Sequence, residues 1–128
     1  MRLRFLDLRT LILQALCTGC DILSPGDCVA IGRFALNVTV EDSITGSTPQ
    51  VATRVIARDG TYADTLILLA PDPTFRAFAL APERPGSYFV TVEAEGYRLW
   101  SRANILVERS TGKCHELQGV TIRARIQR

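Results

Sequence analysis

Alternation of apolar and polar side chains is the feature that most constrains the fold of this chain. Leu36, Val38 and Val40 are separated by polar residues, and residues 120–126 repeat the same pattern. A third alternating segment covers residues 88–94, where Phe89 is the one apolar side chain on the polar face. Successive side chains of a strand point to opposite faces of its sheet, so each segment predicts a strand with one buried face.

Four further segments are rich in strand-forming residues but alternate less regularly. They cover residues 51–58, 65–69, 75–81 and 103–108. Turn-forming pairs such as Asp59-Gly60 and Pro85-Gly86 separate the segments, and no stretch after residue 28 carries a long helical periodicity. Short strands at regular spacing predict an all-β fold, an antiparallel Greek-key β-sandwich of about seven strands.

The first 20 residues have the order of a secretory signal. Three arginines precede a short apolar stretch, and small residues precede Cys20. The apolar stretch is shorter than a membrane-spanning helix requires. Leu16-Cys17-Thr18-Gly19-Cys20 resembles the bacterial lipobox, in which a small residue precedes the cysteine that receives diacylglycerol. Here Gly19 and Cys20 fit, whereas Cys17 stands where the pattern has leucine.

The resemblance to the lipobox implies lipidation at Cys20. We therefore expect a lipoprotein-type signal segment at residues 1–20, a tether at 21–28 and a domain at 29–128. The chain is then exported and anchored in the cell envelope by lipid, on the periplasmic side or at the cell surface. Ordinary secretion and an unprocessed chain are the alternatives.

Cys17 and Cys20 also have the spacing of a redox pair or of two zinc ligands. A redox pair is expected beside a βαβ unit, which the pattern does not predict. A zinc site would need Cys28, Cys114 or His115, which are irregularly spaced. We therefore expect no metal and no cofactor. A thiol oxidoreductase remains an alternative only if both cysteines survive processing.

Cys28 and Cys114 stand before the first expected strand and shortly before the last one. Two such cysteines in an exported chain predict a disulfide. Closing so long a loop stabilises the fold by on the order of 4 kcal/mol, less any strain in the native state. Two buried free thiols are the alternative.

One longer motif carries a family resemblance. Residues 85–97 read P-G-S-Y-F-V-T-V-E-A-E-G-Y, and Asp42-Ser43-Ile44-Thr45-Gly46 follows an alternating segment. Together they resemble the carboxypeptidase regulatory-like domain family, over about residues 34–126. The resemblance implies a transthyretin-like (prealbumin-like) sandwich that acts as an accessory, binding or folding module. It implies no catalytic residues.

Few residues suggest chemistry of their own. His115 is the only histidine, and its neighbour Cys114 would point to the opposite face of a strand. The acidic pairs Glu93 with Glu95 and Asp59 with Asp64 are expected to be ordinary charged surface, because the segment around the second pair lacks the dense oxygen ligands of a calcium loop. We therefore expect no enzyme and no catalytic residue.

Charge argues against nucleic acid as a partner. The net charge is +2, and removal of residues 1–20 would leave equal numbers of basic and acidic side chains. The leading hypothesis is a structural or protein-binding accessory module of the cell envelope. The alternative is a carbohydrate-binding module, in which the rings of Tyr97 and Trp100 would stack on sugars. Trp100 could instead close one end of the core.

Overall fold

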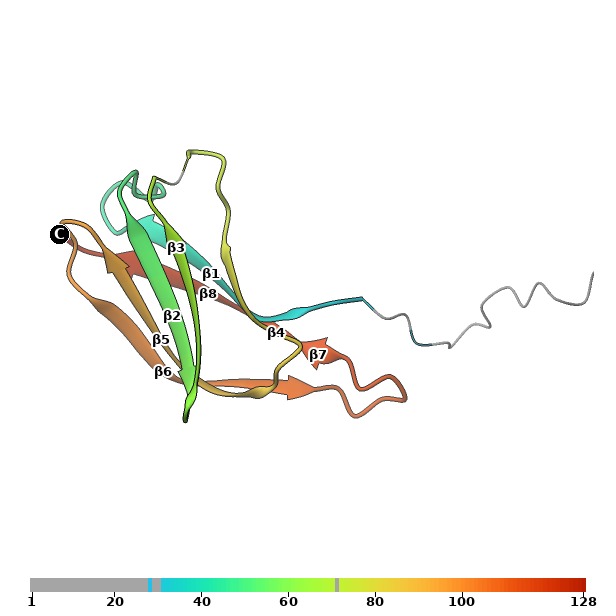
Figure 1. The fold of residues 1–128 in the computed structure, drawn as a ribbon. Coiled ribbons are helices and arrows are strands. Elements are labelled where there is room, and N and C mark those ends of the chain that lie inside the picture. The colour runs from blue at the N-terminus through green and yellow to red at the C-terminus, as the bar shows by residue number, and fades with distance from the viewer. Residues whose placement is uncertain (1–27, 29–30, 71) are drawn as a thin grey trace, which may run out of the picture.

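The computed structural model describes residues 28, 31–70 and 72–128 of the chain. These residues form eight strands in two sheets and contain no helix, which confirms the all-β prediction (Figure 1). The strands are β1 (Phe34–Asp42), β2 (Thr53–Asp59), β3 (Tyr62–Leu68), β4 (Phe78–Pro82), β5 (Gly86–Ala94), β6 (Trp100–Arg109), β7 (Leu117–Gln118) and β8 (Val120–Ile126).

The smaller sheet has the order β4-β1-β8, and the larger has the order β3-β2-β5-β6-β7. All neighbours in the larger sheet are antiparallel, as are β1 and β4. However, β1 and β8 are parallel, in a register that runs from Leu36 opposite Val120 to Asp42 opposite Ile126. The prediction of a wholly antiparallel sandwich is therefore wrong for this pair. Alternation reports which face of a strand is buried but not the direction of its neighbour, and the six intervening strands supply the long connection that a parallel pair needs.

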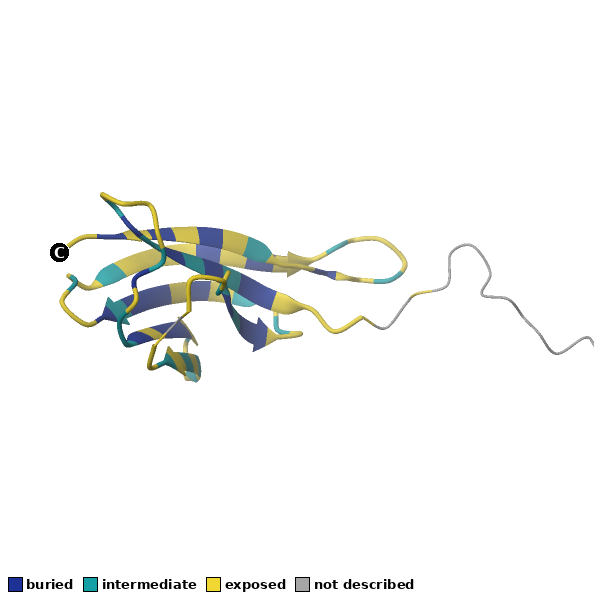
Figure 2. Ribbon diagram, turned by 90° about the horizontal axis from the view of Figure 1, so that it is seen from above, coloured by how far each residue is buried: buried dark blue, intermediate teal, exposed yellow. Residues whose placement is uncertain are grey.

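The core lies between the inward faces of the two sheets. Figure 2 shows buried and exposed residues alternating along the strands. Leu36, Val38 and Val40 are buried in β1, while the outward Phe89 of β5 is 41% exposed. The three alternating segments are thus confirmed as strands with one buried face. The largest fully buried side chains come from five strands and are Tyr88, Phe78, Leu36, Leu80, Leu117, Ile122 and Ile126.

The chain passes from the larger sheet to the smaller one at Gly119, between β7 and β8. A Cβ atom at this position would lie 2.6 Å from the backbone oxygen of Phe34, so only glycine fits without a shift of the backbone. At the other side of the sandwich, Asp64 of β3 accepts a hydrogen bond of 2.7 Å from the amide of Ala81 in β4. The chain crossing at Gly119 and the hydrogen bond of Asp64 thus join the two sheets, one at each side of the sandwich.

The predicted signal segment, Cys17, the proposed lipidation site Cys20 and residues 21–27 of the tether lie outside the described residues. In the part that is described, no apolar helix of bilayer-spanning length occurs.

Candidate functional site

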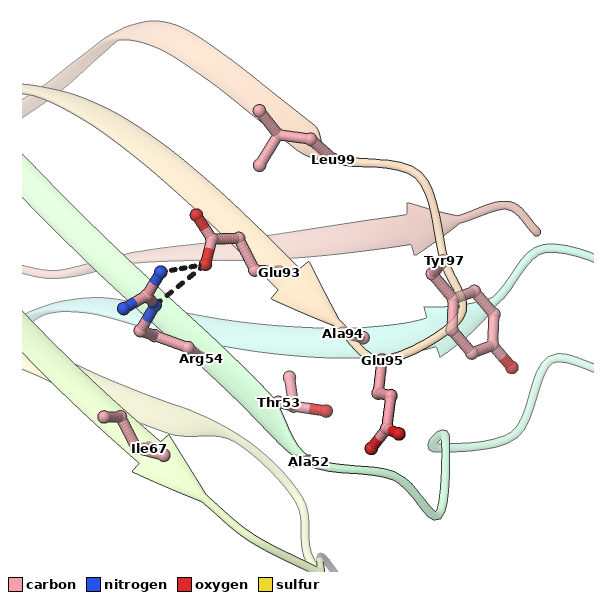
Figure 3. A pocket seen from close by; sticks show the side chains of 9 residues that line it. All are labelled: Ala52, Thr53, Arg54, Ile67, Glu93, Ala94, Glu95, Tyr97 and Leu99. Atoms are coloured by element: carbon pink, nitrogen blue, oxygen red, sulfur yellow. Dashed lines mark hydrogen bonds and ion pairs between the residues drawn. The ribbon is translucent and has the colours of Figure 1, made fainter.

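A groove of about 570 Å³ lies at the end of the larger sheet where β2 begins and β5 ends (Figure 3). It is open to solvent, and its walls come from β2, β3, β5 and the turn before β6. The lining residues are Ala52, Thr53, Arg54, Ile67, Glu93, Ala94, Glu95, Tyr97 and Leu99.

An ion pair flanked by two aliphatic side chains crosses the groove. Arg54 is opposite Ile67 of β3 on one side and opposite Glu93 of β5 on the other. Its Nε donates a hydrogen bond of 2.8 Å to Oε2 of Glu93, and a second guanidinium nitrogen contacts the same oxygen. Ile67 is 55% exposed and Leu99 is 64% exposed. The groove therefore offers apolar surface beside a neutralised pair of charges.

The ion pair itself adds little to stability. Both side chains are nearly half exposed, and water screens such pairs so that each is worth about 0–1 kcal/mol. Its effect is instead local, because an unpaired charge would cost more free energy to desolvate when an apolar ligand covers the groove than these two paired charges do.

Tyr97 and Glu95 form the far end of the groove, next to Ala52 (Figure 3). The hydroxyl of Tyr97 donates to Oδ2 of Asp42 at 2.7 Å. The guanidinium carbon of Arg128 lies 5.2 Å from the centre of the Tyr97 ring. Glu95 is exposed and forms no ion pair with another described residue. The groove thus has a tyrosine whose hydroxyl is fixed by Asp42, and the carboxylate of Glu95 is available to a ligand.

Asp42 organises the turn behind the groove. Its Oδ1 accepts hydrogen bonds from the amides of Ile44 at 2.8 Å and Thr45 at 3.1 Å, an arrangement typical of aspartate at the start of a turn. The hydrogen bond from Tyr97, followed by these two amide bonds, lowers the pKa of Asp42 below its ordinary value of 3.8. Asp42 is therefore a structural carboxylate held in its charged form.

The two aromatic residues predicted as a sugar platform are not brought together in the groove. Tyr97 lines it, whereas Trp100 is half buried, packs against the core and is absent from the lining. A sugar-binding platform needs aromatic rings with an exposed face. The Tyr97 ring, however, packs against the core and lies beside Arg128. Among the described residues the one ring-to-ring contact is between Phe75 and Phe78.

The acidic pairs from the sequence have separate structural partners. Glu93 pairs with Arg54 in the groove. Asp59 forms an ion pair of 2.9 Å with Arg84, while Asp64 bonds the amide of Ala81. The described residues contain no cluster of three side chains that could bind a metal ion.

The predicted disulfide between Cys28 and Cys114 is formed, with an S–S distance of 2.02 Å. It lies in a second hollow of about 380 Å³, beside the loop that joins β6 to β7. Arg109 donates hydrogen bonds to the backbone oxygens of Glu83 at 2.8 Å and His115 at 3.2 Å. His115 is exposed, and Cys114 carries no thiol in this state.

Arg54, Ile67 and Leu99 were not anticipated as site residues from the sequence. The available signal was an isoleucine and a leucine at outward or turn positions, where a solvent-facing sheet usually carries polar residues. Ile67 stands between Leu66 and Leu68, so this apolar segment does not alternate with polar residues. The sequence alone therefore does not show which of the three side chains faces solvent.

No known protein family matches the sequence. A comparison with curated proteins also finds no match. No solved structure matches the chain either.

Proposed function

We propose that this chain is a non-catalytic, exported lipoprotein module that binds a segment of a protein partner in its groove. The proposal has three parts, which are a lipid anchor at Cys20, a domain of the carboxypeptidase regulatory-like kind, and a protein-binding site at Ile67 and Leu99. Each part rests on different residues and is tested separately.

The anchor is supported by the sequence of residues 1–20. Positively charged residues come first, an apolar stretch follows, and small residues lead up to Cys20. Acyl chains contribute about 0.8 kcal/mol for each methylene group buried in the bilayer, so more than one chain on Cys20 would hold the domain firmly. The intact mass of the protein purified from its host tests this part. Loss of residues 1–19 with added acyl mass on Cys20 is expected, and an unmodified full-length chain would overturn it.

The family assignment is supported by the roles of its motif residues. Tyr88, Val90 and Val92 of the motif are buried in the core, and Tyr97 bonds Asp42 of the second motif. The connection also has Greek-key character, since β4 returns to lie beside β1 while β2 and β3 lie in the other sheet. Accessory and binding roles are what this resemblance implies.

The observation that carries the binding function is the exposure of Ile67 and Leu99 on either side of the Arg54–Glu93 pair. Single exposed apolar side chains are ordinary, but a groove with apolar walls and a few polar groups is the usual form of a binding site. The chemistry favours a partner segment with an aliphatic side chain to cover these walls and a basic side chain to meet Glu95.

A protein partner is favoured over a glycan by the state of the aromatic rings. Stacking on a sugar requires an open ring face, yet Tyr97 is held between Asp42 and Arg128, and Trp100 packs against the core. Aliphatic walls, in contrast, are suited to protein side chains.

Site-specific photo-crosslinking in the native host tests the binding site. A photoreactive residue at position 99 should give a discrete protein adduct, whereas one at Thr121, exposed on the smaller sheet, should not. The adduct identifies the partner, and Ile67→Asp should then weaken binding of the purified partner at least tenfold without lowering the melting temperature. Equal adducts at both positions, or binding unaffected by Ile67→Asp, would contradict the proposal. A glycan array that gives a hit lost in Trp100→Ala would favour carbohydrate binding instead.

A further inference from the structure

The disulfide determines where the N-terminal tether meets the domain. Cys28 is bonded to Cys114 in the loop between β6 and β7, with their Cα atoms 5.3 Å apart. The tether therefore attaches to the domain at this loop and not at Phe34, where β1 begins.

The disulfide and the groove lie at opposite ends of the sandwich. β1 runs from Phe34, beside the disulfide hollow, to Asp42, which bonds Tyr97 of the groove. β6 runs the opposite way and ends at Arg109, which lines the disulfide hollow. Figure 1 shows β7 at one end of the molecule and the C-terminus at the other. Strands rise about 3.3 Å per residue, so β1 separates the two ends by about 30 Å.

The disulfide also shortens the reach of the tether. A chain spans at most about 3.6 Å per residue, so the path from Cys20 to Cys28 bridges at most about 29 Å. Without the disulfide the path would continue to Phe34 and could bridge about 50 Å. The cross-link therefore keeps the β6–β7 loop closer to the site at which Cys20 is anchored.

We infer that the disulfide end of the domain faces the lipid headgroups and that the groove is presented away from the bilayer. The inference rests on the proposed lipid anchor at Cys20. A partner that fills the groove then approaches from the side of the domain remote from the membrane.

The chemistry of the disulfide end indicates which lipid surface it tolerates. Arg33 pairs with Glu116 at 3.2 Å, and Arg109 pairs with Glu83 at 3.6 Å. Because these cations are matched by carboxylates, this end does not require anionic lipid. The tether, and not attraction to charged headgroups, sets the orientation, so it should persist in zwitterionic bilayers and at high salt.

Energy transfer from a single tryptophan to a dansylated headgroup tests the orientation. Acylated protein that begins at Cys20, purified from its host, is placed in phosphatidylcholine vesicles. Trp100→Phe combined with Thr111→Trp reports on the β6–β7 loop, and Trp100→Phe combined with Gln50→Trp reports on the groove end; both added positions are exposed. The wild type, whose only tryptophan is Trp100, gives an unaltered reading near the groove.

Transfer from position 111 should exceed transfer from position 50 at least twofold, with anionic lipid and salt having little effect. Cys28→Ser/Cys114→Ser should reduce the difference between the two positions. Equal transfer from both positions with the disulfide intact would overturn the inference. If the intact mass shows no acylation, the anchor proposal fails instead, so the two failures are distinguishable.

Discussion

The hydroxyl of Tyr97 donates a hydrogen bond of 2.7 Å to Asp42, whose other carboxylate oxygen bonds the amides of Ile44 and Thr45. One buried carboxylate thus joins the turn after β1 to the turn after β5. These are the aspartate and the final tyrosine of the two sequence motifs, so the motifs describe one structural unit behind the groove.

The first prediction concerns the pH dependence of stability. Because the pKa of Asp42 in the fold lies below 3.8, the charged carboxylate stabilises the fold above that pH, and this contribution is lost as the pH falls through the folded pKa. Tyr97→Phe removes the largest cause of the shift. The free energy of unfolding in urea should therefore be lower than that of the wild type at pH 6, and it should fall less between pH 6 and pH 3.

Tyr62→Phe is the control for this measurement, because Tyr62 has no contact with Asp42 in the hydrogen bonds or ion pairs of the described residues. It should keep the wild-type pH dependence. If Tyr97→Phe loses as much stability on acidification as the wild type, Asp42 is not the group that the tyrosine controls.

The second prediction concerns a tyrosine buried in the core. Tyr88 is 1% exposed, and its hydroxyl donates a hydrogen bond of 2.6 Å to the backbone oxygen of Arg84. Tyr88→Phe leaves that oxygen without this partner and should lower the free energy of unfolding by about 1–2 kcal/mol. Tyr62→Phe is again the matched variant, since its ring lies 4.0 Å from the Arg84 guanidinium and a phenylalanine would keep that contact. It should change stability by less than about 0.5 kcal/mol, and equal losses in the two variants would refute the assignment.

The sequence predicted the strands whose two faces differ. β8 buries one face and exposes the other, and β1 and β5 bury one face more completely than the other, so their period is visible in the residue order. β2 and β3 were placed less accurately, because Ile56 is buried on the outward side of β2 while Ile67 is exposed on β3. β7 has two residues and carries no period, and its pairing with β6 depends on the tertiary fold.

The site was less predictable than the fold. Tyr97 was identified through its motif, and the Cys28–Cys114 disulfide through the position of the two cysteines. Ile67 and Leu99 come from β3 and from the turn before β6, and β2 and β5 lie between them. Their shared groove follows from strand order, which no local pattern contains. Trp100 was found as an aromatic residue, but its packing against the core could not be distinguished from exposure by sequence alone.

The third prediction tests the crossing between the sheets. Gly119→Ala would place a Cβ atom 2.6 Å from the backbone oxygen of Phe34, which cannot move without disturbing β1. The loss in free energy of unfolding should be about 1–3 kcal/mol. Gly112→Ala is the matched control, because a Cβ atom there meets no other atom within 4 Å. A stability change of the same size in both variants would show that the crossing tolerates a side chain.

The fourth prediction separates the role of the disulfide in stability from its role in orientation. The bond closes a loop with a sequence separation of 86 residues, and the loss of chain entropy in the unfolded state corresponds to about 4 kcal/mol. Cys28→Ser/Cys114→Ser should lower the free energy of unfolding by about this amount while the sandwich still folds, because both cysteines lie outside the eight strands and the core. Urea unfolding of the variant, beside wild type reduced and alkylated, measures the difference. A loss of less than about 1 kcal/mol in both samples would show that the unfolded chain is already constrained, and the bond would then serve mainly to hold the tether at the β6–β7 loop.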